Sequence, residues 1–175
     1  MPNERITDKD HTYTRPSRPR ERRHRLPAEC YRGRQRVAFT ICGAIDCMNL
    51  ADKSVFSHLR AWLADSWAKH DADIVALTAM SDHVHALLEG CTDDADVLSA
   101  AKLFKQRCGF RSKKRFPHLR LQKDFYNHIL RDEEDFPKHV YYLLNNPVRA
   151  GLATGWDEYP YSFVRDDLRD QLTHG

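Results

Sequence analysis

Two apolar runs with a two-residue break between them most constrain how this chain can fold. The runs are DADIVALTAM, residues 71–80, and HVHALLEG, residues 83–90, and Ser81 and Asp82 separate them. Parallel neighbours need a crossover of about a dozen residues or more, so a break this short joins antiparallel strands. We therefore predict a β-hairpin over residues 73–89.

A strand and a helix are predicted before the hairpin. Val37, Phe39 and Ile41 alternate with smaller residues, which is the period of a strand with one buried face. Ser54 is a typical helix cap, and an apolar residue recurs every three or four positions after it. We therefore expect a helix over residues 55–69.

A second helix is predicted after the hairpin. The polar residues 92–94 supply capping groups, and an apolar stripe then continues as far as Cys108. Gly109 is expected to end this helix, because glycine commonly follows a helical C-terminus. The basic stretch 110–120 contains Pro117 and is therefore predicted to be a loop.

The predicted domain ends with a strand near 124–129 and a helix over RDEEDFPKHVYYLLNN, which Pro147 should terminate. The resulting order, β-α-β-β-α-β-α, predicts an α+β protein with a ferredoxin-like (RRM-like) antiparallel sheet and helices mainly on one face. We expect a flexible basic arm over 1–25, one folded domain over 26–152 and a C-terminal tail over 153–175.

Basic charge is gathered in two blocks. Residues 1–36 contain eleven Lys or Arg against five acids, and residues 102–123 contain nine and no acid. Such blocks suit nucleic-acid phosphates, although a solvated helix face and a disordered arm would look the same. The candidate DNA contacts are Arg18, Arg20, Arg22, Arg23, Lys102, Lys105, Arg111, Lys113, Lys114, Arg115 and Arg149, with Phe110 and Phe116 as candidate base-stacking groups.

The sequence gives no sign of a membrane or secreted protein. No apolar stretch approaches the ~20 residues of a membrane helix, and the N-terminus lacks the apolar middle of a signal peptide. The five cysteines are odd in number and form no CxxC pair, which disfavours a disulfide framework or a zinc finger. We expect a cytoplasmic, nucleoid-associated protein without a membrane partner.

His83 and His85 are the first candidate site. Alternate residues of a strand share a face, so the two imidazoles can bind one ion together. With ten histidines in the chain, such a pair also arises by chance, and both interpretations stay open on spacing alone.

The last predicted helix supplies the second half of the site. Tyr142 and Asn146 are four residues apart and therefore lie on one flank of that helix. A divalent ion held by His83, His85 and Asn146 could polarise a phosphodiester, and the Tyr142 hydroxyl could attack its phosphorus. A half-buried tyrosine and a helix-ending asparagine are the alternative.

Several segments resemble one family. MSDHVHALLEG is similar to the histidine motif of HUH single-tyrosine transposases, and NHILRDEEDF followed by YYLLNNPVRAGL is similar to the closing signature of REP-associated tyrosine transposases, within the IS200-like transposases. The opening RLPAECYRG also resembles that family, so the resemblance runs from Arg25 to Leu152. Asp82 departs from it, because asparagine is usual before the histidines.

The resemblance implies an HUH endonuclease fold and a metal-dependent enzyme that cleaves and rejoins single-stranded or hairpin DNA of palindromic repeats. Tyr142 would be the nucleophile of a 5′-phosphotyrosine intermediate, and His83, His85 and Asn146 would bind Mg²⁺ or Mn²⁺. A non-catalytic, domesticated protein that binds repeat hairpins is the alternative, and a hydrolase of small phosphoesters is a weaker one. We expect a monomer in preference to a homodimer.

Overall fold

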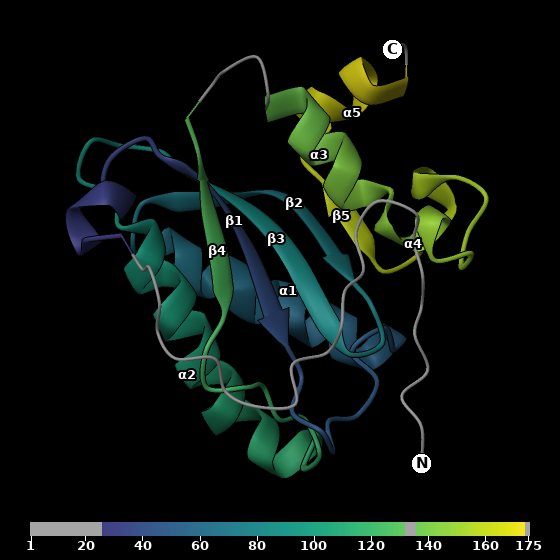
Figure 1. Cartoon of the computed structure of the whole chain (residues 1–175). Coiled ribbons are helices and arrows are strands. Elements are labelled where there is room, and N and C mark those ends of the chain that lie inside the picture. Colours follow the sequence, from purple (N-terminus) through teal and green to yellow (C-terminus); the bar gives the residue numbers. More distant parts are fainter. Residues whose placement is uncertain (1–25, 132–135, 174–175) are drawn as a thin grey trace.

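The computed structural model describes residues 26–131 and 136–173 (Figure 1). The arm residues Arg18, Arg20, Arg22 and Arg23 and the acidic residues 132–135 lie outside the described residues. The elements are, in chain order, η1 Ala28–Tyr31, β1 Arg36–Cys42, α1 Lys53–Ala68, β2 Ala72–Ala79, β3 His83–Gly90, α2 Val97–Arg115, β4 Tyr126–Leu130, α3 Phe136–Leu144, α4 Asn146–Arg149, η3 Trp156–Glu158, β5 Ser162–Val164 and α5 Asp166–Thr173.

The strands form one antiparallel sheet in the order β4-β1-β3-β2-β5. The predicted hairpin is confirmed as β2 and β3, and the amide of Met80 donates to the carbonyl of His83 across its turn, at 2.8 Å. The first four strands have the order 4-1-3-2, which the predicted ferredoxin-like fold requires. The fifth strand extends the sheet on the β2 side.

The first face of the sheet is covered by α1 and α2, which lie behind it in Figure 1. Val37, Phe39 and Ile41 of β1 all belong to the large core beneath these helices, and each is almost fully buried. Because side chains alternate along a strand, Ala38 and Thr40 project from the opposite, second face.

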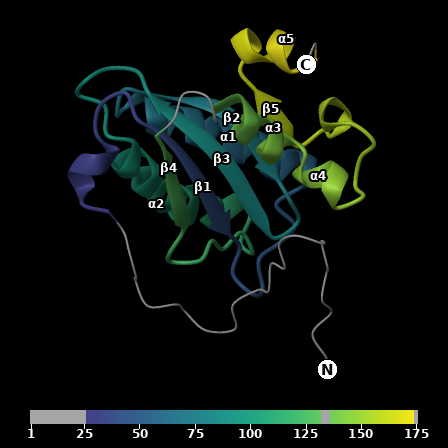
Figure 2. The same ribbon diagram turned by 45° about the horizontal axis from the view of Figure 1, so that its top comes forward.

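The second face is covered only in part. The apolar stripe of α3, formed by Phe136, Val140, Leu143 and Leu144, packs with Leu87 of β3 in a separate core. Burying each such side chain contributes roughly 1.5–3 kcal/mol, so the stripe fixes α3 on the sheet. Figures 1 and 2 show α3, α4 and β5 gathered toward the β2 side, so most of the β4 and β1 side is left without a helix among the described residues.

The segment after Leu152 takes part in the fold within the described residues. Ser162–Val164 pair with β2, and Val164 and Leu168 belong to the second core. Tyr159 donates its hydroxyl to the carbonyl of Ala79 at 2.9 Å. The expected domain end at residue 152 is therefore too early, because residues 159–168 belong to the fold and cover the β2 edge of the sheet.

The predicted end of the second helix is wrong. Helix α2 passes through Gly109 and continues to Arg115. Its buried face extends through Ser112 to Phe116, and this packing outweighs the penalty of about 1 kcal/mol for a helical glycine. The basic residues of the last turn also lie at the negative end of the helix dipole, where cations are favourable.

The predicted helix caps are also wrong. Asp52 caps α1 by accepting from the amides of Ser54 and Val55, and Asp96 caps α2 by accepting from the amide of Ser99. Each aspartate lies two to four residues from the predicted cap, a shift that the run of polar residues before each helix permits.

Pro147 begins a helix where we expected it to end one. Helix α3 ends at Leu144, and Asn146 starts the short α4 with Pro147 in its first turn. A proline is accommodated there, because the first amides of a helix have no partner within it.

Within the described residues, no helix combines the length and apolar composition of a membrane span.

Candidate active site on the second face of the sheet

Two histidine side chains converge on the second face. His83 and His85 are alternate residues of β3 and project from the same side of the sheet. Their Nε2 atoms lie 3.0 Å apart, and their ring planes are nearly perpendicular, at 86°. The two imidazoles therefore present neighbouring nitrogens to one small volume.

Asp82 orients the first of these histidines. Its Oδ1 atom lies 2.7 Å from Nδ1 of His83. A carboxylate can only accept a hydrogen bond, so Nδ1 is the donor. In this tautomer the imidazole carries its lone pair on Nε2, the atom that faces His85. The carbonyl of Asp82 accepts from the amide of Gly43 at 2.7 Å, which ties this turn to the end of β1.

Thr40 orients the second histidine. It is the register partner of His85 in β1, and its hydroxyl lies 3.1 Å from Nδ1 of the ring. Burial, followed by the nearby positive charges of His83 and Arg149, lowers the pKa of His85 to about 3. The ring is therefore neutral at physiological pH, and a threonine hydroxyl that accepts from Nδ1 leaves a second lone pair on Nε2.

The spacing of the two nitrogens fits a divalent ion. Two ligand bonds of about 2.1 Å at a right angle hold their nitrogens about 3.0 Å apart. Neutral imidazoles with their other nitrogen hydrogen-bonded are the usual histidine ligands. Among the described residues no group of three His, Cys, Asp or Glu side chains converges. An ion here would therefore need an amide oxygen, water or substrate to complete its coordination.

The neutral state of His85 predicts an acid-sensitive fold. Its pKa is about 3 in the folded chain and 6.5 in its unperturbed state, so between these values only the unfolded chain binds the proton. The free energy of unfolding should then fall as pH falls, by at most about 1.4 kcal/mol per pH unit. Urea unfolding in EDTA at pH 6.5 and 4.5 should show a loss about 2 kcal/mol larger in the wild type than in His85→Gln. Equal losses in both proteins would contradict this.

Tyr142 lies on the flank of α3, with its side chain 49% exposed. The guanidinium of Arg149, one turn into α4, lies 4.5 Å from the centre of its ring. The charge of Arg149 also lowers the pKa of His85, so this arginine lies within electrostatic range of that histidine. The predicted nucleophile and one predicted DNA contact thus contact each other.

The flank that carries Tyr142 faces the uncovered side of the sheet. His139, three residues earlier on α3, stacks on His128 of β4, with ring centres 6.0 Å apart and planes at 19°. His128 is the register partner of Ala38 and therefore projects from the second face, as His85 does. At about 100° per residue, His139 and Tyr142 lie on the same flank.

Asn146 lies at the junction of α3 and α4. Its Nδ2 atom donates to the carbonyls of Leu143, at 3.0 Å, and Tyr142, at 3.2 Å. These bonds hold the amide plane and leave Oδ1 as the free end of the side chain. The described structure brings Asn146 beside Tyr142 and places no hydrogen bond between Asn146 and either histidine.

The predicted basic contacts of α2 differ in their surroundings. Lys102, Lys105 and Lys113 line a cavity between α2 and residues 117–125. Arg111 instead forms an ion pair with Asp65 of α1, at 2.9 Å. Lys114 and Arg115 are exposed at the end of α2 and do not line that cavity.

The two candidate stacking residues differ in exposure. Phe110 is 77% exposed on α2 and remains available for stacking. Phe116 is buried and packs edge-to-face against Trp62 and His58 of α1. A stacking role for Phe116 is therefore wrong, because the same ring anchors the end of α2.

Sequence reasoning missed two groups that the structure places at functional positions. Thr40 contacts His85 across the β1–β3 pair, and only the strand register could have revealed it. Arg120 and Lys123 join the lysines of α2 around the cavity, because the 117–125 segment folds back along the helix.

Comparison with known proteins finds similarity to transposases. Residues 46–129 match the family model described as "Transposase IS200 like", a range that contains the histidine pair and ends before Tyr142. A Haemophilus influenzae protein that carries the name REP-associated tyrosine transposase is 27% identical over 111 residues, covering 57% of this chain. The chain matches 63% of the length of that relative.

One solved structure shows the same fold. A REP-associated tyrosine transposase bound to a REP hairpin superposes with a TM-score of 0.70 at 22% identity, covering 86% of this chain and 87% of that chain. A structure assigned as a transposase of Deinococcus radiodurans R1 superposes with a TM-score of 0.48 at 20% identity, covering 74% of this chain and 97% of the other.

Proposed function

We propose that this chain is a member of the IS200-like transposase family, whose model residues 46–129 match, and that it is a metal-dependent single-stranded DNA endonuclease and strand transferase. Its substrate is hairpin or palindromic repeat DNA, and its intermediate is a 5′-phosphotyrosine. Tyr142 is the nucleophile, and His83, His85 and Asn146 hold the divalent ion.

One observation supports this proposal above the others. His83 and His85 present Nε2 atoms 3.0 Å apart on the sheet face toward which the Tyr142 flank of α3 turns. Arg149 contacts the Tyr142 ring and acts electrostatically on His85, which supports a shared site for the tyrosine and the histidines. The proposed nucleophile and the proposed ion ligands are linked in this way through one cation that could bind phosphate.

The proposed reaction exchanges one phosphodiester for another. The Tyr142 hydroxyl loses its proton and its oxygen bonds to the scissile phosphorus, while the bond from phosphorus to the 3′ oxygen breaks. The 3′ oxygen takes up a proton and leaves as a free 3′-OH. Attack by a 3′-OH on the phosphotyrosine reverses these steps, so strands are rejoined without ATP. Arg149 is placed to balance negative charge on the attacking oxygen and the phosphate.

The ligand atoms fit a divalent ion. When bound, the ion supplies positive charge that polarises the phosphate and offsets the charge gained at the transition state. Nε2 of His83, Nε2 of His85 and Oδ1 of Asn146 are the protein atoms that would hold it. Two imidazoles favour Mn²⁺ over Mg²⁺, which prefers oxygen ligands.

The hairpin substrate is proposed from the solved relative, which is described as bound to a REP hairpin. We propose that this chain acts on such DNA as a monomer. The β4–β1 surface, most of which no described helix covers, adjoins the histidine strand β3, so a DNA strand can approach there.

The proposal is tested by covalent capture. A hairpin oligonucleotide with single-stranded flanks, labelled at either end, is incubated with the full chain and Mn²⁺ and separated under denaturing conditions. We expect a protein–DNA adduct that retains the 3′ label and an unattached 5′-labelled fragment, both lost in EDTA. Hairpin binding without any adduct in Mn²⁺ or Mg²⁺ would instead support a non-catalytic binding protein.

The contact from Asp82 to His83 predicts an effect on ion affinity. Replacing Asp82 by asparagine removes a negative charge 2.7 Å from the ring nitrogen and weakens its orientation. Loss of such an outer partner typically lowers metal affinity 10- to 100-fold, and we expect about tenfold for this conservative change. Calorimetric titration with Mn²⁺ measures it, and Asp73→Asn, in β2, is the matched control. Unchanged affinity in Asp82→Asn would exclude the carboxylate from this role.

A further inference from the structure

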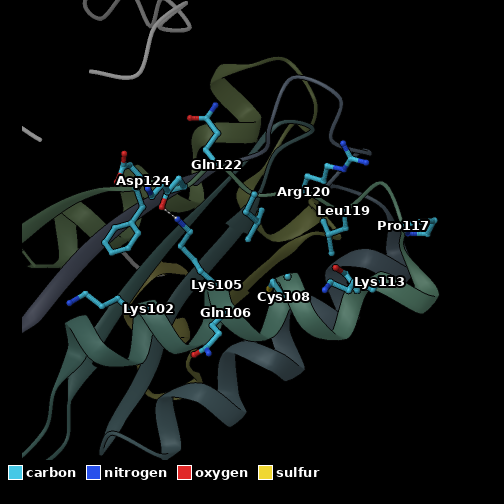
Figure 3. Close-up of a pocket in the computed structure, with 15 residues that line it drawn as sticks. Lys102, Lys105, Gln106, Cys108, Lys113, Pro117, Leu119, Arg120, Gln122 and Asp124 are labelled. Carbon is cyan, nitrogen blue, oxygen red and sulfur yellow. Dashed lines mark hydrogen bonds between the residues drawn. The ribbon is translucent and has the colours of Figure 1, made fainter. Parts of the chain in front are cut away.

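A basic cavity of about 720 Å³ lies away from the histidine pair, between α2 and the segment 117–125 (Figure 3). It is lined by five cationic side chains and by one carboxylate, that of Asp124. The cations are Lys102, Lys105, Lys113, Arg120 and Lys123. Such an excess of positive charge in a recess favours an anionic ligand.

The helical wall of the cavity is one continuous stripe. Lys102, Gln106, Gly109 and Lys113 recur at three- and four-residue intervals and so lie along one face of α2. Figure 3 shows Lys102 and Lys113 at separate points along the helix, with Lys105 between them reaching across toward the opposite segment. Phosphates of a nucleic-acid strand that follows the helix would meet Lys102 and Lys105 at one end of this wall and Lys113 at the other.

Gly109 leaves a gap in the middle of this stripe. A Cβ atom added at Gly109 would meet no heavy atom within 4 Å, so nothing in the protein requires glycine there. Glycine in a helix interior is less favourable than any residue except proline. The open space belongs to the cavity, where it lets a ligand approach the helix backbone closely.

The opposite wall is apolar in part: Leu121 is partly exposed, whereas Leu119 and Phe125 are largely buried. Leu119, Leu121 and Phe125 line the cavity, and Phe125 is packed edge-to-face against Phe39 of the core. Lys105 lies over the Phe125 ring, 5.2 Å from its centre, and donates to the carbonyl of Lys123. Apolar side chains beside cations are the combination that holds the bases and phosphates of a single strand.

The cavity is joined to the histidine strand by a short structural path. The amide of Gln122 donates to the carbonyl of Cys42 at 2.8 Å, and Cys42 is the register partner of His83. Two strand spacings, about 10 Å, therefore separate the Gln122 backbone from β3. A strand that leaves the histidine face over this end of the sheet reaches the cavity within a few nucleotides.

We propose that this cavity binds the single-stranded DNA that flanks the hairpin, with phosphates on the lysine stripe of α2 and a base against the apolar wall. The assignment to the flank of the cleaved strand rests on the proposed function. The binding of single-stranded DNA itself rests on the cavity, and it is tested without metal or cleavage.

The test measures binding of fluorescent dT12 in EDTA across a range of salt concentrations. The double variant Lys102→Gln/Lys113→Gln should bind at least about tenfold more weakly at 0.1 M salt, with a salt dependence shallower by about 1.4 log units per decade. The control Lys53→Gln/Lys69→Gln removes the same charge from exposed positions of α1 and should leave both quantities unchanged. Equal losses in the two double variants would overturn the proposal, because net charge alone would then explain binding.

A steric variant keeps the charge constant. Gly109→Leu should weaken dT12 binding on the order of tenfold while its unfolding temperature stays the same or rises, because leucine favours the helix. Unchanged binding in Gly109→Leu, or tighter binding of rU12 than of dT12 to the wild type, would overturn the assignment. If the wild type forms the adduct and both pocket variants bind dT12 normally, the cavity is rejected and the transposase is retained. If the pocket variants bind dT12 weakly and the wild type forms no adduct, the cavity is retained and the transposase is rejected.

Discussion

Replacing Tyr142 by phenylalanine is expected to abolish the covalent protein–DNA adduct. The change removes one oxygen atom and leaves the aromatic ring, so the contact with Arg149 at 4.5 Å persists. Because the side chain is half exposed and its hydroxyl is not needed for the second core, the fold should be unaffected. Removal of an enzymatic nucleophile lowers turnover by many orders of magnitude, and we expect a loss of at least about 10³-fold on denaturing gels.

The neighbouring tyrosine provides a matched control for this experiment. Tyr141 is 53% exposed, similar to Tyr142, but it lies about 100° further round α3 and off the flank that carries His139. Tyr141→Phe should therefore form the adduct at the wild-type rate. Hairpin binding in EDTA should be the same in both variants. An adduct that persists in Tyr142→Phe and disappears in Tyr141→Phe would identify Tyr141 as the nucleophile instead.

The architecture of the sheet could be predicted because its signals are local. The two-residue break between the two apolar runs allows only a hairpin, and strict alternation in β1 indicates which residues face the helices. The same alternation places His83 and His85 on one face before any coordinates are known. Contacts between strands are different, because the pairing of Thr40 with His85 depends on the register of β1 against β3.

The positions of helix ends were harder to predict because tertiary packing decides them. Gly109 and Pro147 are both strong local signals for ending a helix, yet α2 continues through the first and α4 begins around the second. Burial of Phe116 against Trp62 stabilises the extra turns of α2, and no local sequence pattern predicts this contact. The consequence is functional, since the extended α2 carries Lys113 to the wall of the basic cavity.

The histidine pair and the Tyr142–Asn146 pair could each be predicted from the sequence, but their arrangement relative to each other could not. The spacing of Tyr142 and Asn146 on one helix flank follows from helical geometry alone. Whether that flank turns toward β3 depends on how the apolar stripe of α3 docks on the sheet, and its stripe packs against Leu87 and Val75. The link through Arg149, which contacts Tyr142 and acts on His85, appears only in three dimensions.

The second large effect is expected from the histidine pair. His83→Gln and His85→Gln each remove one of two Nε2 atoms that lie 3.0 Å apart, and a glutamine cannot place a nitrogen lone pair at that point. Loss of an outer partner of a metal ligand costs 10- to 100-fold in affinity or activity, so loss of a ligand should cost at least on the order of 10²-fold. We expect Mn²⁺ binding and adduct formation to fall together in both variants.

Comparison with a third histidine separates ion binding from a general effect of removing imidazole near DNA. His128 lies on the same face of the sheet, on β4, and its ring stacks on His139 rather than on the pair. His128→Gln should bind Mn²⁺ and form the adduct as the wild type does, and all three variants should bind the hairpin equally well in EDTA. If His83→Gln and His85→Gln lost hairpin binding in EDTA and kept their affinity for Mn²⁺, the two imidazoles would be DNA contacts, and the ion would have to be held elsewhere. If they lost Mn²⁺ binding and still formed the adduct, Tyr142 would act without the ion, with Arg149 as the cation beside it.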